Sequence, residues 1–245
     1  MSNLNNSPAT GGEEGFQQHL WPIGSTRRCR RTRSLTRCSL LLGGALFLGS
    51  ANAASPSFNC LQATAPAART ICASAQLSML DQQLTFLWQR FTQVFTAPVA
   101  VQILANDQRR WILARSACRF DENCLLKHYQ ARLDLLSGRS RQFPAAGIYG
   151  ADHGRVFGLF PQAKDYLVAI RGVSPDAKAS RCEIVGRAIL DGSSLTVIAY
   201  HLSFTARLGK SQKLIVAPAD RVSVVEEASC GDTGRIDATY TRLER

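Results

Sequence analysis

Apolar residues between positions 77 and 136 recur at the spacing of amphipathic helices. Steps of three and four residues place one stripe on a first long helix, formed by Leu77, Leu80, Leu84, Leu87, Phe91 and Val94. Pro98 interrupts this pattern. After it, a second helix is predicted with one face made of Leu104, Gln108, Trp111, Arg115 and Cys118. A helix is therefore expected on each side of Pro98.

Two further helices are predicted in this region. Asp121 is expected as the N-cap of one of them, because it precedes a stripe of Cys124, Leu125, Tyr129, Leu133 and Leu136. A shorter helix is predicted around Ala65–Ala73, where it carries Cys72. Residues 54–138 thus form a predicted all-α unit, which is small for a core that has no further support.

The pattern changes near residue 140 to short β-rich runs separated by Gly, Pro and Asp. These runs are Val156–Phe160, Tyr166–Ile170, Glu183–Leu190, Leu195–Tyr200, Leu214–Val216, Val222–Val225 and Ile236–Leu243. Asp191-Gly192 lies between two of them and indicates a hairpin. We therefore predict an α+β chain in two domains: helices over 54–138, a linker over 139–147, and a small antiparallel β barrel or sandwich over 148–245.

The first 53 residues carry the features of an N-terminal extension and a secretory signal peptide. Six arginines between positions 27 and 37 precede the apolar run 38–49, and Ala51-Asn-Ala53 follows it. The run is too short to cross a bilayer, which takes about 20 residues. We expect cleavage near Ala53 and a periplasmic or secreted protein with no membrane span. Removing six arginines and two glutamates lowers the net charge from +11 to +7.

Six cysteines follow the predicted cleavage site, and an even number in an exported chain suggests disulfides. The intervals between them do not match the usual zinc-binding spacings, so no metal site is expected. The preferred pairs are Cys60 with Cys72, Cys118 with Cys124, and Cys182 with Cys230. Spacing alone leaves open the crossed pairings of Cys60 or Cys72 with Cys118 or Cys124.

Several motifs in residues 57–136 resemble the N-terminal domain of LprI-type lysozyme inhibitors, which are small exported helical domains. The matching segments are Phe58-Asn-Cys60, Ala68-Arg-Thr-Ile-Cys72-Ala, Leu80-Asp81-Gln-Gln-Leu84, Asp107-Gln108-Arg-Arg-Trp111, Arg115-Ser-Ala-Cys118, Cys124-Leu125 and Tyr129-Gln-Ala-Arg132-Leu133. Two positions depart from the family pattern, since Ser116 follows Arg115 where the family has Asp, and Trp88 stands where it has Tyr. The resemblance does not cover the β-rich half.

The resemblance implies a protein that blocks lysozyme or another cell-wall lytic enzyme. Electrostatics argues against a simple version of this function, because animal lysozymes are basic and favour acidic partners. Residues 54–138 carry a net charge of +3, and residues 145–245 carry +2. A local acidic patch can still provide the contact with a basic partner. Asp121 with Glu122 is one candidate, and Glu226 with Glu227 is another.

Trp111 and Arg115 admit two interpretations. Exposed on the second helix, they are a candidate binding hot spot. Turned inward, Trp111 fills the helical core and Arg115 covers it and pairs with a carboxylate, for which Asp81 is the candidate. Helical spacing places Gln108, Trp111, Arg115 and Cys118 on one face of the helix. Because Cys118 is expected to form a disulfide, this face includes the buried one, and the structural interpretation is favoured.

No catalytic motif or cofactor-binding motif stands out. Asp152 and His153 lie in a Gly-rich turn, which is a common structural setting for such residues, and Ser193-Ser194 follows a hairpin signal rather than forming a nucleophile elbow. We therefore predict a protein-binding module that is not an enzyme and needs no cofactor. Nucleic acid is not an expected partner, because the basic residues are scattered. The alternative function is a non-inhibitory envelope or structural protein whose β domain binds a ligand or partner.

Overall fold

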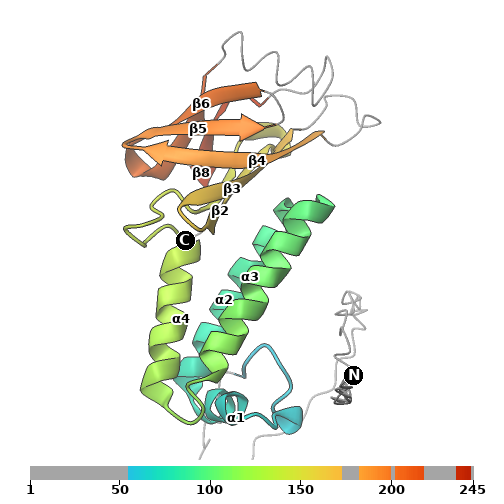
Figure 1. Ribbon diagram of the computed structural model, residues 1–245, viewed down its shortest axis with the longest axis vertical. Helices are drawn as coiled ribbons and strands as arrows, with labels where there is room; N and C mark the ends of the chain where they lie inside the picture. Colours follow the sequence, from blue (N-terminus) through green and yellow to red (C-terminus); the bar gives the residue numbers. More distant parts are fainter. Residues whose placement is uncertain (1–54, 173–181, 200–201, 218–235, 244–245) are drawn as a thin grey trace, which may run out of the picture. The chain divides into compact units, whose positions relative to one another are not determined.

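Four α-helices make up the first part of the residues that the computed structural model describes, which are 55–172, 182–199, 202–217 and 236–243. The helices are α1 (Pro66–Ala73), α2 (Ala75–Val94), α3 (Pro98–Ser116) and α4 (Glu122–Leu136), after a short 3₁₀ turn, η1 (Cys60–Gln62) (Figure 1). Proline starts α1 and α3, where its missing N–H has no helical partner to lose. The Asp121 carboxylate caps α4 by accepting a hydrogen bond from the Cys124 N–H at 2.9 Å, so the predicted N-cap is confirmed.

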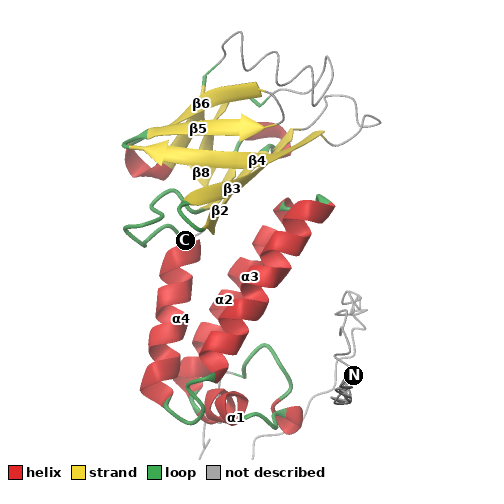
Figure 2. Cartoon of the chain, viewed as in Figure 1, coloured by secondary structure: helices red, strands yellow, loops and turns green. Residues whose placement is uncertain are grey.

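Eight antiparallel strands form a closed barrel in which each strand pairs with the next and β1 pairs with β8 (Figure 2). Their bounds are β1 (Gly147–Gly150), β2 (Val156–Gln162), β3 (Asp165–Gly172), β4 (Cys182–Asp191), β5 (Ser194–Ala199), β6 (Leu202–Leu208), β7 (Lys213–Val216) and β8 (Ala238–Arg242). The predicted α+β fold with a barrel is therefore confirmed. Gly192, with a φ of 57°, forms the predicted hairpin turn between β4 and β5.

The strands differ in how many of their faces are buried. β5 alternates, with Leu195 and Val197 pointing into the barrel. β2 is buried on both faces, because Phe157 and Leu159 fill the barrel while Phe160 packs outward against the helices. A strand that is buried on both faces is apolar throughout, which explains the unbroken run at the start of β2.

The helices cover one part of the outer surface of the barrel. Phe160 of β2 lies edge-on to Phe91 of α2, with ring centroids 5.4 Å apart. It belongs to a single buried cluster with helical residues and with the outward-facing Leu167 of β3. A Cβ atom at Gly158 would lie 2.7 Å from the Phe95 ring, so glycine permits this close approach. The residues assigned from sequence to two domains thus share one apolar cluster.

Two charged side chains of the barrel bind the ends of helices. Glu183 of β4 accepts hydrogen bonds from the backbone N–H groups of Thr96 and Ala97, both at 3.1 Å, and so caps the start of α3. Arg242 of β8 donates to the Ser137 carbonyl at the end of α4, at 2.7 Å, and to the Tyr149 hydroxyl at 2.6 Å. The start of α3 thus receives a negative charge and the end of α4 a positive charge, and the helix dipole favours both.

Part of the predicted pattern differs from the structure. The strands β1 and β6 were not predicted, and β1 begins at Gly147 inside the predicted linker. Within that linker, Phe143, Ala145 and Ala146 are buried in the barrel core, so this connection is packed. The predicted signal region over residues 1–53, the run Val222–Val225 and the acidic pair Glu226 and Glu227 lie outside the described residues, as does Cys230, the predicted partner of Cys182.

Candidate functional site

Asp81 lies at the centre of a buried polar network that joins three helices. This residue of α2 is 5% exposed, and its carboxylate accepts a hydrogen bond from the Tyr129 hydroxyl of α4 at 2.7 Å. Arg115 of α3 lies 3.7 Å from the same carboxylate oxygen and donates to the Tyr129 hydroxyl at 2.7 Å. Ser57 donates to the other carboxylate oxygen through its N–H at 2.7 Å and its Oγ at 2.5 Å. The predicted Asp81–Arg115 pair is present.

Trp111 encloses the cationic end of this network. The Arg115 guanidinium lies 5.1 Å from the Trp111 ring centroid and 5.7 Å from that of Tyr129. The two rings meet edge to face at 5.4 Å. Since α3 turns Trp111 and Arg115 towards α4, neither forms the exposed hot spot that was the alternative prediction. The aromatic rings attract the cation and exclude water from it.

A second buried pair, missed in the sequence analysis, joins α3 and α4. Arg132 is nearly fully buried and donates to the Asp107 carboxylate at 2.5 Å and to the predicted motif residue Gln108 at 3.3 Å. Its guanidinium also lies 5.7 Å from the Trp88 ring centroid. Arg132 falls within the apolar stripe that contains Tyr129 and Leu133. A charged residue on an apolar stripe is the sequence signal from which this buried ion pair could have been predicted.

Burial has opposite consequences for the two networks, since it favours the neutral tyrosine donor of one and opposes the arginine charge of the other. It raises the pKa of the Tyr129 hydroxyl well above the usual value, and the adjacent Asp81 carboxylate adds to this, while Arg115 opposes it. The tyrosine is thus held as a neutral donor. Burial lowers the pKa of the Arg132 guanidinium, and the Asp107 carboxylate counteracts that effect. These groups position helices, and none of them is an exposed nucleophile or base.

Two disulfide-closed loops lie at the end of the helices that is away from the barrel contacts. Cys60–Cys72 closes the loop around η1 and α1, and Cys118–Cys124 closes the turn between α3 and α4. These are the preferred local pairs rather than the crossed ones. The Ser74 hydroxyl at the start of α2 donates to the Glu122 carboxylate of α4 at 2.5 Å, linking the two regions. We call residues 59–63 and 118–124 together the tip.

The tip presents large apolar side chains to solvent. Leu61 is 96% exposed and Phe120 is 64% exposed. Phe120 is held between Arg119, which has a φ of 53°, and the capping residue Asp121. Helix α2 spans 20 residues, or about 30 Å, so the tip is far from the end of α2 that contacts the barrel. Asp121 and Glu122, the predicted partner-contact residues, are exposed here although both also bind the scaffold.

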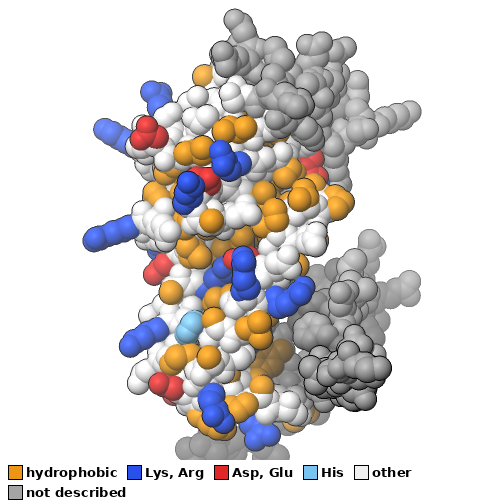
Figure 3. Space-filling model, viewed as in Figure 1, with side chains coloured by type: hydrophobic (Ala, Val, Ile, Leu, Met, Phe, Trp, Pro, Cys, Tyr) orange, Lys and Arg blue, Asp and Glu red, His pale blue; other side chains and the backbone are white. Residues whose placement is uncertain are grey.

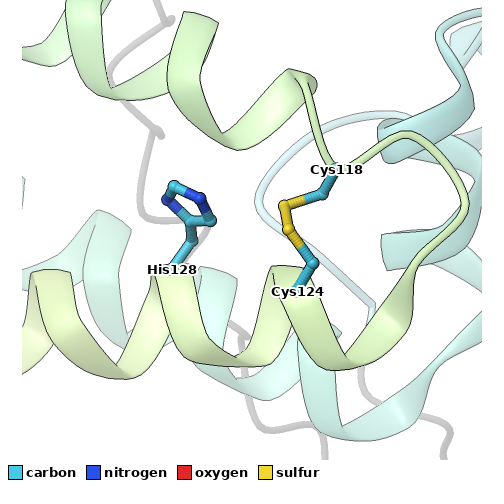
Figure 4. Close-up of side chains that lie close together, drawn as sticks. All are labelled: Cys118, Cys124 and His128. Carbon is cyan, nitrogen blue, oxygen red and sulfur yellow. A yellow bond between two sulfur atoms is a disulfide. The ribbon is translucent and has the colours of Figure 1, made fainter.

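His128 lies beside one of these disulfides (Figure 4). One of its ring nitrogens and the sulfurs of Cys118 and Cys124 lie within 4.8 Å of one another. Thiolates and imidazole are metal ligands, but in this structure the two sulfurs are bonded to each other. The cluster is therefore a covalent cross-link as it stands.

Charged side chains are dispersed over the face of the molecule that Figure 3 shows. On the face in Figure 3, Lys and Arg side chains are spread over both the helices and the barrel. Within the residues that the structure describes, no helix is both long and apolar enough to span a membrane. Comparisons with protein-family models, curated proteins and solved structures found no match to this chain. The LprI-type resemblance therefore rests on the sequence motifs alone.

Proposed function

We propose that this chain is an exported protein-binding module that blocks a cell-wall lytic enzyme of the lysozyme type. The observation that carries the proposal is the tip, where a short turn closed by Cys118–Cys124 holds Phe120 out in solvent. A binding loop that is already ordered loses little conformational entropy when it associates. Exposed aromatic side chains on such loops supply much of the free energy of binding.

The buried networks support a binding function because they hold the helices together from inside and leave the residues of the tip exposed. Asp81, Gln108, Trp111 and Arg115, the recognisable motif residues, hold α2, α3 and α4 together. The residues that carry the family resemblance thus form a scaffold that orients the tip. Asp121 and Glu122 place two negative charges beside Phe120, which favours a basic partner despite the positive net charge.

The alternative function, a β domain that binds a ligand, finds less support. Phe157, Tyr166 and Tyr240 are buried in the barrel interior, together with the aliphatic residues around them. The interior of an eight-stranded barrel is narrow enough for its own side chains to fill it. The barrel instead contributes the anchor points Glu183 and Arg242 for the helices.

The test is a lysis assay in which the purified protein is added to an animal lysozyme acting on bacterial cell walls. We expect wild-type protein to slow the loss of turbidity, and Phe120→Ala to weaken this inhibition about 30-fold, as loss of a contact worth ~2 kcal/mol would. Phe86 of α2, which is 62% exposed away from the tip, supplies the matched control. Phe86→Ala should inhibit like the wild type.

Two results would contradict this function. One is a rate of lysis that does not change at a large molar excess of the wild-type protein. The other is an equal weakening of inhibition by Phe120→Ala and Phe86→Ala, which would show that the tip does not contact the lytic enzyme.

A further inference from the structure

Cys118, Cys124 and His128 bring three potential metal ligands together, and the disulfide between the cysteines does not account for the nearby histidine. Cys124 and His128 are four residues apart on α4, so their side chains rise from one face of the helix (Figure 4). Cys118 approaches the same point from the end of α3. All three ligand atoms lie within 4.8 Å of one another. A histidine is not needed to close a disulfide.

We propose that reduction of Cys118–Cys124 converts this turn into a three-ligand binding site for Zn²⁺. Two thiolates and one imidazole are a common ligand set for this ion, and they leave a fourth position for water. The inference rests on the geometry of the turn and does not depend on the identity of the partner protein.

The geometry of the turn is compatible with this exchange. In a tetrahedral site with Zn–S bonds of about 2.3 Å, the two sulfurs lie roughly 3.8 Å apart. The sulfurs must therefore separate after reduction, and the Cα atoms of the two cysteines, 5.6 Å apart, leave this to side-chain rotation. Cys118 is buried, whereas Cys124 and His128 are half-buried, so the ion has a route from solvent.

The chemistry balances in two steps. A dithiol reductant gives two electrons and two protons to the disulfide and becomes a disulfide itself, leaving Cys118 and Cys124 as thiols. Zn²⁺ then displaces both thiol protons and takes the lone pair of the neutral His128 imidazole. The resulting site carries no net charge from its ligands and metal. Asp121 and Glu122, on the same turn, add negative charge nearby.

The consequence is that one turn has two alternative cross-links between α3 and α4. Under oxidising conditions the disulfide closes it, and under reducing conditions the metal does. For a chain that is exported, as proposed above, these conditions are met in succession before and after export. The metal would thus hold the tip in place before its disulfide forms.

The test uses the purified chain with Co²⁺ as a spectroscopic probe and Zn²⁺ as the competitor. The protein is freed of metal and reduced without oxygen by a phosphine, which is oxidised to the phosphine oxide with water as the oxygen source. Tetrahedral thiolate ligation of Co²⁺ gives intense visible bands and sulfur-to-metal charge-transfer bands. We expect one Co²⁺ per reduced chain, displaced by Zn²⁺, and no such bands from the oxidised chain.

Variants separate this site from other thiols. The Cys60→Ser, Cys72→Ser double variant, which lacks the other described disulfide, should bind Co²⁺ like the wild type. In that background, His128→Asn should weaken binding at least tenfold, whereas Lys127→Gln, an exposed change next to it, should have no effect. Circular dichroism should show that the reduced Zn²⁺-bound protein keeps its helices.

Each of three outcomes would overturn the proposal. These are equal affinity for Co²⁺ in the His128→Asn and Lys127→Gln variants, equal binding by the oxidised and reduced chains, and a loss of helix on reduction that Zn²⁺ does not reverse.

Discussion

The helices and the barrel stabilise themselves in contrasting ways. The three buried polar or charged residues of the described chain, Ser78, Asp81 and Arg132, all belong to the helices. Both described disulfides lie there as well. The barrel core consists of apolar and tyrosine side chains. A closed barrel pairs its strands all round and leaves no edge, whereas four short helices bury little surface and need specific links.

This contrast separates two kinds of ion pair. Asp81 is buried among groups that lose their partner when the carboxylate is removed. Asp165 of the barrel pairs with Arg187 at 3.5 Å, where the arginine side chain is 57% exposed. The two aspartates thus allow the same substitution to be compared in both settings.

The largest effect is expected from Asp81→Ala. It leaves the Arg115 cation without its counter-ion and leaves the Tyr129 hydroxyl and Ser57 without their acceptor. The free energy of unfolding should therefore fall by about 3–5 kcal/mol. Asp165→Ala should cost at most ~1 kcal/mol, because its pair is screened by water. Urea unfolding followed by circular dichroism measures both. Equal losses from the two variants would show that the buried network adds no more than a surface pair.

A smaller effect is expected where the two regions meet. Glu183→Ala removes the cap of α3, which should lower the free energy of unfolding by about 1–2 kcal/mol. Glu183→Gln keeps an acceptor but loses the charge and should show an intermediate loss. Amide hydrogen exchange should accelerate at the start of α3 and stay unchanged in β5. Uniform acceleration in both elements would mean that Glu183 supports the whole fold rather than this junction.

The smallest effect concerns alkaline pH. The folded-state pKa of Tyr129 is raised, so the stability it contributes is complete below the unfolded pKa of about 10 and is lost as the pH rises through the folded pKa. Above pH ~10 the free energy of unfolding should fall by up to about 1.4 kcal/mol per pH unit for this group. Tyr129→Phe should remove that part of the slope, although it lowers stability at neutral pH.

Tyr166 of the barrel is the matched control. Burial raises its pKa too, but the Ala145 N–H, which donates to its hydroxyl, and the Arg242 cation both oppose the rise. Tyr166→Phe should therefore flatten the alkaline slope less than Tyr129→Phe. Urea unfolding at several pH values gives both slopes, and the reverse order would contradict the inference that burial, with a smaller contribution from Asp81, holds Tyr129 neutral.

Much of the local structure was predictable because it depends on local patterns. The helical stripe from Leu77 to Val94, the cap at Asp121 and the hairpin at Gly192 depend on residues a few positions apart. The strands β1 and β6 were missed for different reasons. β1 is short and bounded by glycines, which resembles a linker, and one of its two partner strands is β8 at the far end of the chain. β6 does alternate through Phe204 and Ala206, so a closer count of its period would have found it.

The candidate site divides in the same way. Sequence alone indicated the cysteine pairs, the Asp81–Arg115 contact and the acidic residues at the turn, because motifs and helical spacing relate them. Only the tertiary structure brought Arg132 to Asp107 and Glu183 to the start of α3. Those contacts join elements whose relative positions follow from packing a whole core, and no local pattern of residues encodes that packing.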